Sequence, residues 1–217
     1  MLYSSAIDRP VGLLLGGSTS PRPDVSKERT QQILEAAMKV FSRAGFQKAS
    51  MDDIVAESGL SKGALYWYFK SKDEIIAGIL DYLFARELAD IRALPEAEGS
   101  AHDRLLRFAQ FTLAEIRQMT RLLPITYEFY TLALRNKTVQ RVLKKYLANY
   151  LAGLIPVIEQ GMARGEFRKM DARQVSISFG AIVEGALLLW VFDPKLVNLE
   201  AQIESGIQLL LAGLERT

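Results

Sequence analysis

The chain of 217 residues contains no cysteine and a single histidine, His102. The absence of cysteine excludes disulfide bonds, thiolate metal ligands and cysteine nucleophiles. One histidine cannot form a two-histidine metal site, and no G-x-S-x-G turn accompanies it, so the common metal and serine hydrolase motifs are missing. The sequence therefore predicts a protein that is not an enzyme and that needs neither a metal nor a cofactor.

Long hydrophobic runs are also missing. The longest apolar stretches, such as residues 186–192, are far shorter than the ~20 residues that a membrane-spanning helix needs. Residues 1–24 contain six prolines and glycines, and we interpret this segment as a flexible tail. Hydrophobic residues still make up 49% of the chain, enough for a sizeable core, so we expect a soluble cytoplasmic protein with no membrane partner.

Net charge is small, at +2, but it is unevenly distributed. Residues 25–72 carry eight Lys or Arg and five Asp or Glu, a local charge of +3, whereas residues 73–217 are nearly neutral. A basic N-terminal unit joined to a larger neutral unit favours a polyanionic partner for the first unit only.

Nearly every segment has a helical period, and no alternating strand pattern is visible. Capping residues at segment starts and glycines at segment ends predict an all-α fold of about nine helices. We expect them at 27–44, 50–57, 61–68, 71–94, 100–118, 124–134, 137–163, 171–192 and 198–214.

Residues 50–72 have the pattern of a helix-turn-helix: a short helix, a glycine-containing turn at 58–60, and a second short helix. The second helix must be slim at its leading end to enter a major groove about 12 Å wide. The residues at that end are small or flexible, namely Ser61, Lys62, Gly63 and Ala64. Lys62 can reach a base edge or a phosphate, and Leu65 is expected to face the core.

Three large aromatic residues, Tyr66, Trp67 and Tyr68, follow one another, so their side chains must point in different directions. We expect the Tyr66 hydroxyl to bond a phosphate and Lys72 to neutralise the same DNA strand. The alternative is structural, with Trp67 and Phe69 plugging the junction between the small unit and the next helix.

At these residues the chain resembles the TetR family of bacterial transcriptional regulators. The matching run of about 48 residues includes Ala44-Gly45-Phe46, residues 50–56, residues 59–69 and Lys72-Asp-Glu. The resemblance implies DNA contacts from Ser50, Ser61, Lys62, Gly63, Tyr66, Trp67, Tyr68 and Lys72. It also implies a homodimer that places two recognition helices on a palindromic operator.

Segment 171–192 is apolar on almost every side, so it must be buried on several sides. A four-helix interface between two copies, made with segment 198–214, explains this pattern, and the resemblance implies the same pairing. The predicted interface residues are Phe179, Val183, Leu187, Trp190, Ile207 and Leu210. The alternative is a core helix of a monomer.

Aromatic and methionine side chains in the C-terminal unit suit an apolar ligand cavity, although ordinary core packing is the alternative for each. The candidates are Phe108, Phe111, Met119, Tyr127, Tyr130, Tyr150 and Met162. Glu184 joins them because a carboxylate in the middle of an apolar helix needs a partner. That partner is either an arginine across the dimer or a cationic or hydroxylated ligand.

The sequence therefore predicts a helix-turn-helix DNA-binding domain at residues 25–78 and a ligand-binding and dimerisation domain at residues 79–217. The predicted function is a ligand-responsive repressor that a small-molecule effector releases from its operator. The alternative is a helix-turn-helix protein that activates transcription, organises DNA or binds a protein partner, without a small effector.

Overall fold

The computed structural model describes residues 23–119 and 123–215, and within them it contains nine α-helices. They are α1 (Pro23–Lys48), α2 (Met51–Ser58), α3 (Lys62–Tyr68), α4 (Lys72–Ala93), α5 (Ala101–Met119), α6 (Leu123–Ala133), α7 (Lys137–Ala163), α8 (Ala172–Phe192) and α9 (Leu199–Leu214). A 3-10 turn, η1 (Leu94–Glu96), follows α4. The described part has no β-strand beyond an isolated bridge between Phe167 and Glu215. The all-α prediction is confirmed; the predicted tail lies outside the described residues, except that α1 already begins at Pro23.

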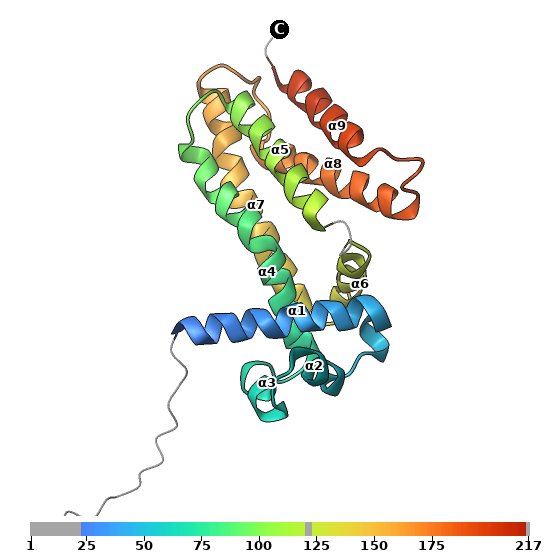
Figure 1. The fold of residues 1–217 in the computed structure, drawn as a ribbon. Helices are drawn as coiled ribbons and strands as arrows, with labels where there is room; N and C mark the ends of the chain where they lie inside the picture. Colours follow the sequence, from blue (N-terminus) through green and yellow to red (C-terminus); the bar gives the residue numbers. More distant parts are fainter. Residues whose placement is uncertain (1–22, 120–122, 216–217) are drawn as a thin grey trace, which may run out of the picture.

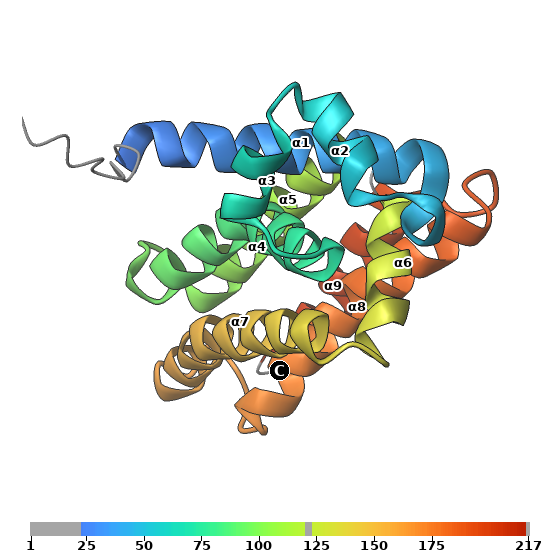
Figure 2. The same cartoon turned by 90° about the horizontal axis from the view of Figure 1, so that it is seen from below.

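The helices are arranged along one long axis, with α1, α2 and α3 at one end (Figure 1). Helices α4 and α7 lie side by side and run from that end to the other, where α5, α8 and α9 pack around them. Seen from below, α2 and α3 lie in front of α1, at the outer surface of this end (Figure 2). The short second helix of the predicted helix-turn-helix is therefore at an extremity of the molecule.

Side-chain caps start most of the helices, as the sequence predicts. In each case a side-chain oxygen accepts a hydrogen bond from a backbone N–H group in the first turn of the helix that follows. The capping residues are Ser50, Ser61, Ser71, Asn136, Asp171 and Asn198. Gly45 interrupts α1 with a φ of 72°, and Phe46 packs back against Phe41 with ring centroids 5.7 Å apart. Gly59 has a φ of 67° and forms the turn between α2 and α3.

The interior consists of two hydrophobic clusters. The N-terminal cluster is formed mainly by α1–α4, and Leu65 of α3 is fully buried in it, as predicted. It also contains Ile79, Phe129 and Val139, which lie beyond the boundary predicted at residue 78. The C-terminal cluster joins α5, α7, α8 and α9. The split at residue 78 stays a prediction, because the N-terminal core continues into α4, α6 and α7.

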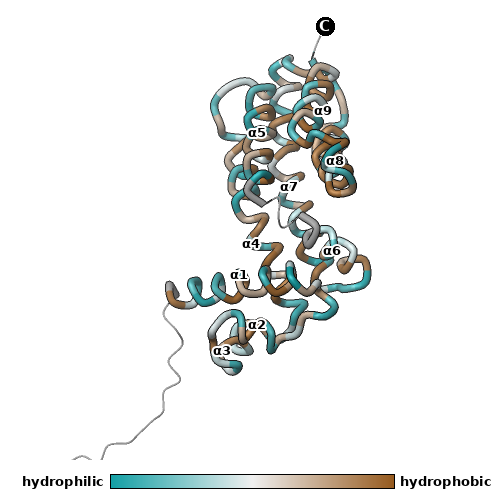
Figure 3. Tube along the Cα trace, turned by 45° about the vertical axis from the view of Figure 1, so that its right-hand side comes forward, coloured by the Kyte–Doolittle hydropathy of each residue, from teal (hydrophilic) through white to brown (hydrophobic). Residues whose placement is uncertain are grey.

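Helix α8 is hydrophobic along much of its length (Figure 3), and by length and composition alone it could cross a membrane. It packs against α7 and α9 in the fold, so part of this apolar surface belongs to the protomer's own core. Four of the predicted dimer residues belong to that core and are at most 8% exposed: Phe179, Val183, Leu187 and Ile207.

The assignment of these four residues to a dimer interface is wrong, because side chains buried within one protomer have no surface to offer a second. Trp190 and Leu210 are half-buried against the same core. Other large apolar side chains of α8, α9 and the segment between them remain exposed, and they include Leu188, Leu189, Phe192, Leu196 and Leu209.

Candidate nucleic-acid interface and ligand pocket

The helix-turn-helix is held together by hydrogen bonds at the start of each of its helices. Ser50 Oγ accepts a bond of 3.1 Å from the Asp53 N–H, while the Asp53 carboxylate accepts one of 2.8 Å from the Ser50 N–H. The Ser50 hydroxyl also donates to Asp53 Oδ2 over 2.6 Å, and this bond, together with the one from the Ser50 N–H, holds the pKa of Asp53 below its ordinary value. At α3, Ser61 Oγ accepts a bond of 3.2 Å from the Ala64 N–H. Ser50 and Ser61 are exposed, and their oxygens already cap helices.

The leading end of α3 is open to solvent. Ser61, Lys62 and Gly63 are all exposed, and a Cβ atom placed on Gly63 would meet nothing within 4 Å. Lys62 Nζ lies 2.7 Å from Asp52 Oδ1, and both side chains are more than half exposed. A phosphate or base can displace such an exposed ion pair easily. The fold itself therefore does not require glycine at position 63.

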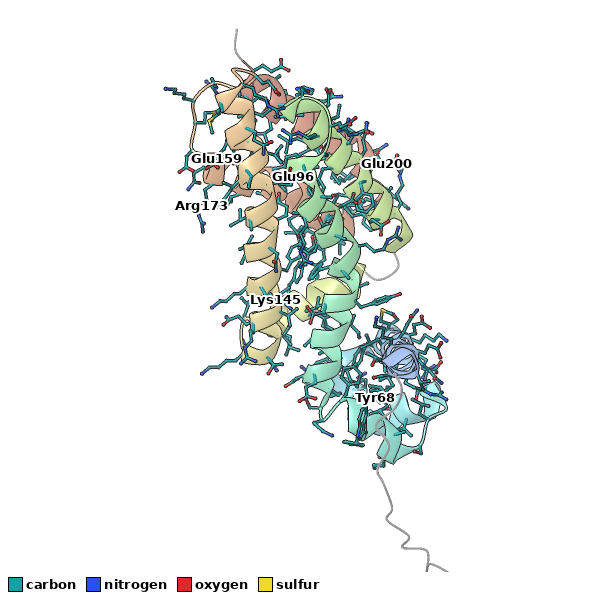
Figure 4. All side chains as sticks on the ribbon, turned by 90° about the vertical axis from the view of Figure 1, so that its left-hand side faces the viewer. Tyr68, Glu96, Lys145, Glu159, Arg173 and Glu200 are labelled. Atoms are coloured by element: carbon teal, nitrogen blue, oxygen red, sulfur yellow. The ribbon has the colours of Figure 1, made fainter. Side chains whose placement is uncertain are left out.

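The aromatic residues after Lys62 divide between the two predicted roles. Trp67 is 55% exposed and stands edge-on to Tyr68, with ring centroids 4.6 Å apart. Tyr66 and Tyr68 are half-buried against the N-terminal core, and Phe69 packs there beside Gly78. The alternative in which both residues plug the junction with the next helix is therefore right for Phe69 and wrong for Trp67. Figure 4 shows Tyr68 among the N-terminal helices, at the opposite end of the molecule from Glu159.

Lys72 has a structural task that the sequence did not predict. Its Nζ donates hydrogen bonds to the carbonyl oxygens of Phe46, at 2.9 Å, and Ala49, at 2.7 Å, and lies 4.4 Å from the centre of the Phe46 ring. The ammonium group therefore clamps the segment between α1 and α2. With two of its three protons used in this way, Lys72 positions α2 rather than standing free beside DNA.

The C-terminal part contains a cavity of about 330 Å³, a volume within the range of small-molecule sites. Five helices line it, with Leu83, Phe84 and Glu87 from α4, Phe108, Thr112, Glu115 and Ile116 from α5, Tyr130 from α6, Tyr146, Leu147 and Tyr150 from α7, and Ile177, Phe179, Gly180, Ala181, Val183, Glu184 and Leu187 from α8.

Half of the predicted pocket residues line this cavity. Phe108, Tyr130, Tyr150 and Glu184 do so. Phe111, Tyr127 and Met162 do not belong to its lining, although the Tyr127 hydroxyl donates to the Glu184 carbonyl oxygen over 3.2 Å. The side chain of Met119 lies outside the described residues.

Two carboxylates in the pocket each accept a hydrogen bond from a tyrosine. The Tyr146 hydroxyl donates to Glu87 Oε2 over 2.8 Å, and the Tyr130 hydroxyl donates to Glu184 Oε1 over 3.4 Å. Burial raises the pKa of Glu87 to about 7, and nearby Glu184 and Glu115 add to the shift. Surrounding protein atoms also raise the pKa of Glu184, although its side chain stays accessible through the hollow of the pocket.

Sequence reasoning missed Glu87 and Thr112. A signal for Glu87 was present, because Ile76, Leu80 and Leu83 place it on an apolar stripe of α4 at helical spacing. This is the argument that identified Glu184 on α8.

Two helices connect the pocket to the helix-turn-helix. Helix α4 buries Ile76 and Ile79 in the N-terminal core and presents Phe84 and Glu87 to the pocket. Helix α6 also contacts both the N-terminal core and the pocket, and it does so with neighbouring residues.

In α6, Glu128 Oε1 accepts a hydrogen bond of 3.1 Å from the Phe46 N–H, Phe129 is fully buried edge-on against Phe41, and Tyr130 lines the pocket. Helices α4 and α6 therefore each contact both the pocket and α1.

Comparison with known proteins gives a consistent result. Residues 33–79 match the tetR family of bacterial regulatory proteins, and residues 101–216 match the C-terminal part of BetI-type transcriptional repressors. The chain is 28% identical over 198 residues to the HTH-type transcriptional regulator YfiR of Bacillus subtilis, covering 85% of this chain and 93% of the relative. It is 27% identical over 191 residues to the HTH-type transcriptional regulator TtgR of Pseudomonas putida, covering 84% and 89%. These relatives are transcriptional regulators, not enzymes.

Solved structures share the fold. A transcriptional regulator from Pseudomonas aeruginosa PAO1 superposes with a TM-score of 0.74 at 26% identity, covering 86% of this chain and 92% of that chain. FadR from Bacillus subtilis in complex with stearoyl-CoA gives 0.73 at 20% identity, covering 85% and 99%. A regulator from Saccharomonospora viridis in complex with choline gives 0.72 at 18% identity, covering 88% and 100%. From the match of both its parts, the chain belongs to the tetR family of bacterial regulatory proteins and is a transcriptional regulator.

Proposed function

We propose that the chain is a homodimeric cytoplasmic repressor that binds a palindromic operator with α3 and releases it when a small molecule occupies the pocket. The observation that carries this proposal is that α4 and α6 line the cavity and also belong to the N-terminal core, in which α3 is anchored by Leu65 with its leading end exposed. Ser61, Lys62 and Gly63 supply the DNA-facing end, and Trp67 and Tyr66 stand beside it. Ser50 and Lys72 shape this surface from within.

The proposed release works through α4 and α6. A ligand between Glu87 and Glu184 displaces α4 through Glu87, and it displaces α6 through Tyr130, which lines the pocket and contacts Glu184. Both α4 and α6 also belong to the N-terminal core. Two recognition helices fit one operator only at one spacing, so a small rotation of each N-terminal unit lowers the affinity for DNA.

The test is binding of the full chain to a DNA fragment from upstream of its own gene, followed by fluorescence anisotropy at several salt concentrations. Lys62→Ala is expected to weaken binding roughly tenfold and to reduce the slope of log affinity against log salt by about one. Lys169→Ala, an exposed lysine after α7 at the far end, is the control and should bind normally. Equal binding by both variants would place the partner of α3 outside DNA.

Gly63 gives a second prediction, in which stability and function change in opposite directions. Gly63→Ala is expected to stabilise the protein by about 0.5 kcal/mol, because alanine favours the helix and its Cβ meets no neighbour. The same methyl group should weaken operator binding by roughly tenfold, because it enters the space between α3 and the bases. Thermal unfolding and anisotropy measure the two effects. A more stable variant with unchanged operator affinity would show that α3 does not enter the groove by this end.

A further inference from the structure

Resting on the proposed function, we infer that the effector of this pocket is an organic cation: a positively charged nitrogen on a compact apolar body, held between Glu87 and Glu184. Neither the fold nor the family supplies this assignment, because structural neighbours of the same fold hold ligands as different as an acyl-CoA and choline.

The charges around the cavity point in one direction. Its lining contains three glutamates and, among the described residues, no lysine, arginine or histidine. Glu115 is already neutralised, since its Oε1 lies 3.1 Å from Nη2 of Arg86, whose side chain is 66% exposed. Glu87 and Glu184 form no ion pair within the described chain. Two carboxylates therefore face one cavity without a cation.

The hydrogen bonds on these carboxylates leave room for a ligand. Among the described residues, the hydrogen bond on each carboxylate comes from a neutral phenol, Tyr146 on Glu87 and Tyr130 on Glu184, and a carboxylate has about four acceptor sites. The phenols orient the carboxylates but contribute no positive charge. The raised pKa of Glu87, about 7, is the expected result for an acid that is buried without a cationic partner.

The walls suit the apolar body of such a cation. Phe84 stacks on Tyr146 with ring centroids 4.0 Å apart, and Phe108 stacks on Phe179 at 5.8 Å. All four rings line the cavity, and aromatic rings attract ammonium groups through their quadrupoles.

A second, independent observation also points to a ligand. Thr112 lines the pocket, is 93% buried, and its Oγ1 finds no hydrogen-bond partner among the described residues. An unpaired buried hydroxyl is costly, so a polar group on the ligand is its natural partner. The same inventory argues against an anion, because a carboxylate or phosphate would be buried beside two glutamates with no cation to balance it.

The experiment compares three probes that share a benzyl group: benzyltrimethylammonium, the neutral isostere neopentylbenzene, and benzylsulfonate. Binding to the full chain is followed by calorimetry and thermal shift. The cation is expected to bind roughly tenfold or more tightly than the neutral isostere, and the sulfonate is expected not to bind. Glu87→Gln and Glu184→Gln should each reduce affinity for the cation about tenfold while affinity for neopentylbenzene is kept. Glu159→Gln, an exposed acid on α7, is the control.

The outcomes separate this inference from the proposed function. Equal affinity for the cation and its neutral isostere, or cation binding that both glutamine variants retain, overturns the assignment of ligand class. Operator release by benzylsulfonate would also overturn that assignment while leaving a ligand-responsive repressor intact. Tight cation binding that both glutamine variants lose, together with unchanged operator affinity, would support the ligand class and contradict the release mechanism.

Discussion

Leu209→Asp is expected to convert the protein into a monomer and to weaken operator binding by roughly 100-fold or more. Leu209 of α9 is 73% exposed, and Leu189 and Phe192 of α8 are also largely exposed, which is unusual for apolar side chains this large. We propose that a second copy covers them. A dimer binds the second half-site at a high effective concentration, so loss of the dimer removes this gain.

Sedimentation and DNA titration measure the two effects together. Leu134→Asp is the matched control, because Leu134 is 80% exposed in the turn after α6, at the other end from α9. The Leu134→Asp variant should remain dimeric, with unchanged affinity for the operator. A Leu209→Asp variant that remains dimeric would mean that the exposed face of α8 and α9 does not pair the subunits.

Glu87→Gln is expected to stabilise the protein at pH 8 by up to about 3 kcal/mol and to leave it unchanged at pH 4. The pKa of Glu87 rises from 4.5 to about 7 on folding. Between these values the unfolded chain has lost the proton that the folded chain keeps, so stability falls as pH rises through this window. Glutamine stays neutral throughout and can still accept the hydrogen bond from Tyr146.

Urea unfolding from pH 4 to pH 8 tests this expectation, with Glu159→Gln as the control on an exposed acid. The groups that face Glu87 are Tyr146, Glu184 and the Glu115–Arg86 pair, and the two acids act in the same direction as burial. Parallel stability curves for the wild type and Glu87→Gln would show that Glu87 is ionised in the folded protein at neutral pH.

Most helix boundaries follow from the sequence, because they are set by local chemistry. The caps at Ser50, Ser61 and Ser71 and the left-handed glycines at 45 and 59 involve residues no more than a few positions apart. The exposed leading end of α3 follows from the same kind of pattern. Local sequence therefore gives the all-α fold and the recognition helix.

Other features depend on contacts between distant residues, and sequence reasoning missed them for that reason. Lys72 bonds carbonyl oxygens 23 and 26 positions away, so nothing beside it in the sequence marks it as a clamp. An apolar helix such as α8 carries no sign of which side faces the core, so Phe179 and Val183 were assigned to the wrong surface. Glu87 enters the pocket only because α4 and α8 both pack against α7.

The most direct test of the whole account is the distance between the two helix-turn-helix units in the dimer. The chain has no cysteine, so Ala56→Cys on exposed α2 gives one spin label per subunit. Pulsed electron paramagnetic resonance would measure the distance between the two labels in the operator-bound dimer and in the dimer saturated with benzyltrimethylammonium. The cation is used at a concentration at which calorimetry shows that the pocket is filled. We predict one narrow distance on DNA and a shifted distribution with the cation. The same distribution in both states would contradict the proposal that occupancy of the pocket controls DNA binding by moving the recognition helices.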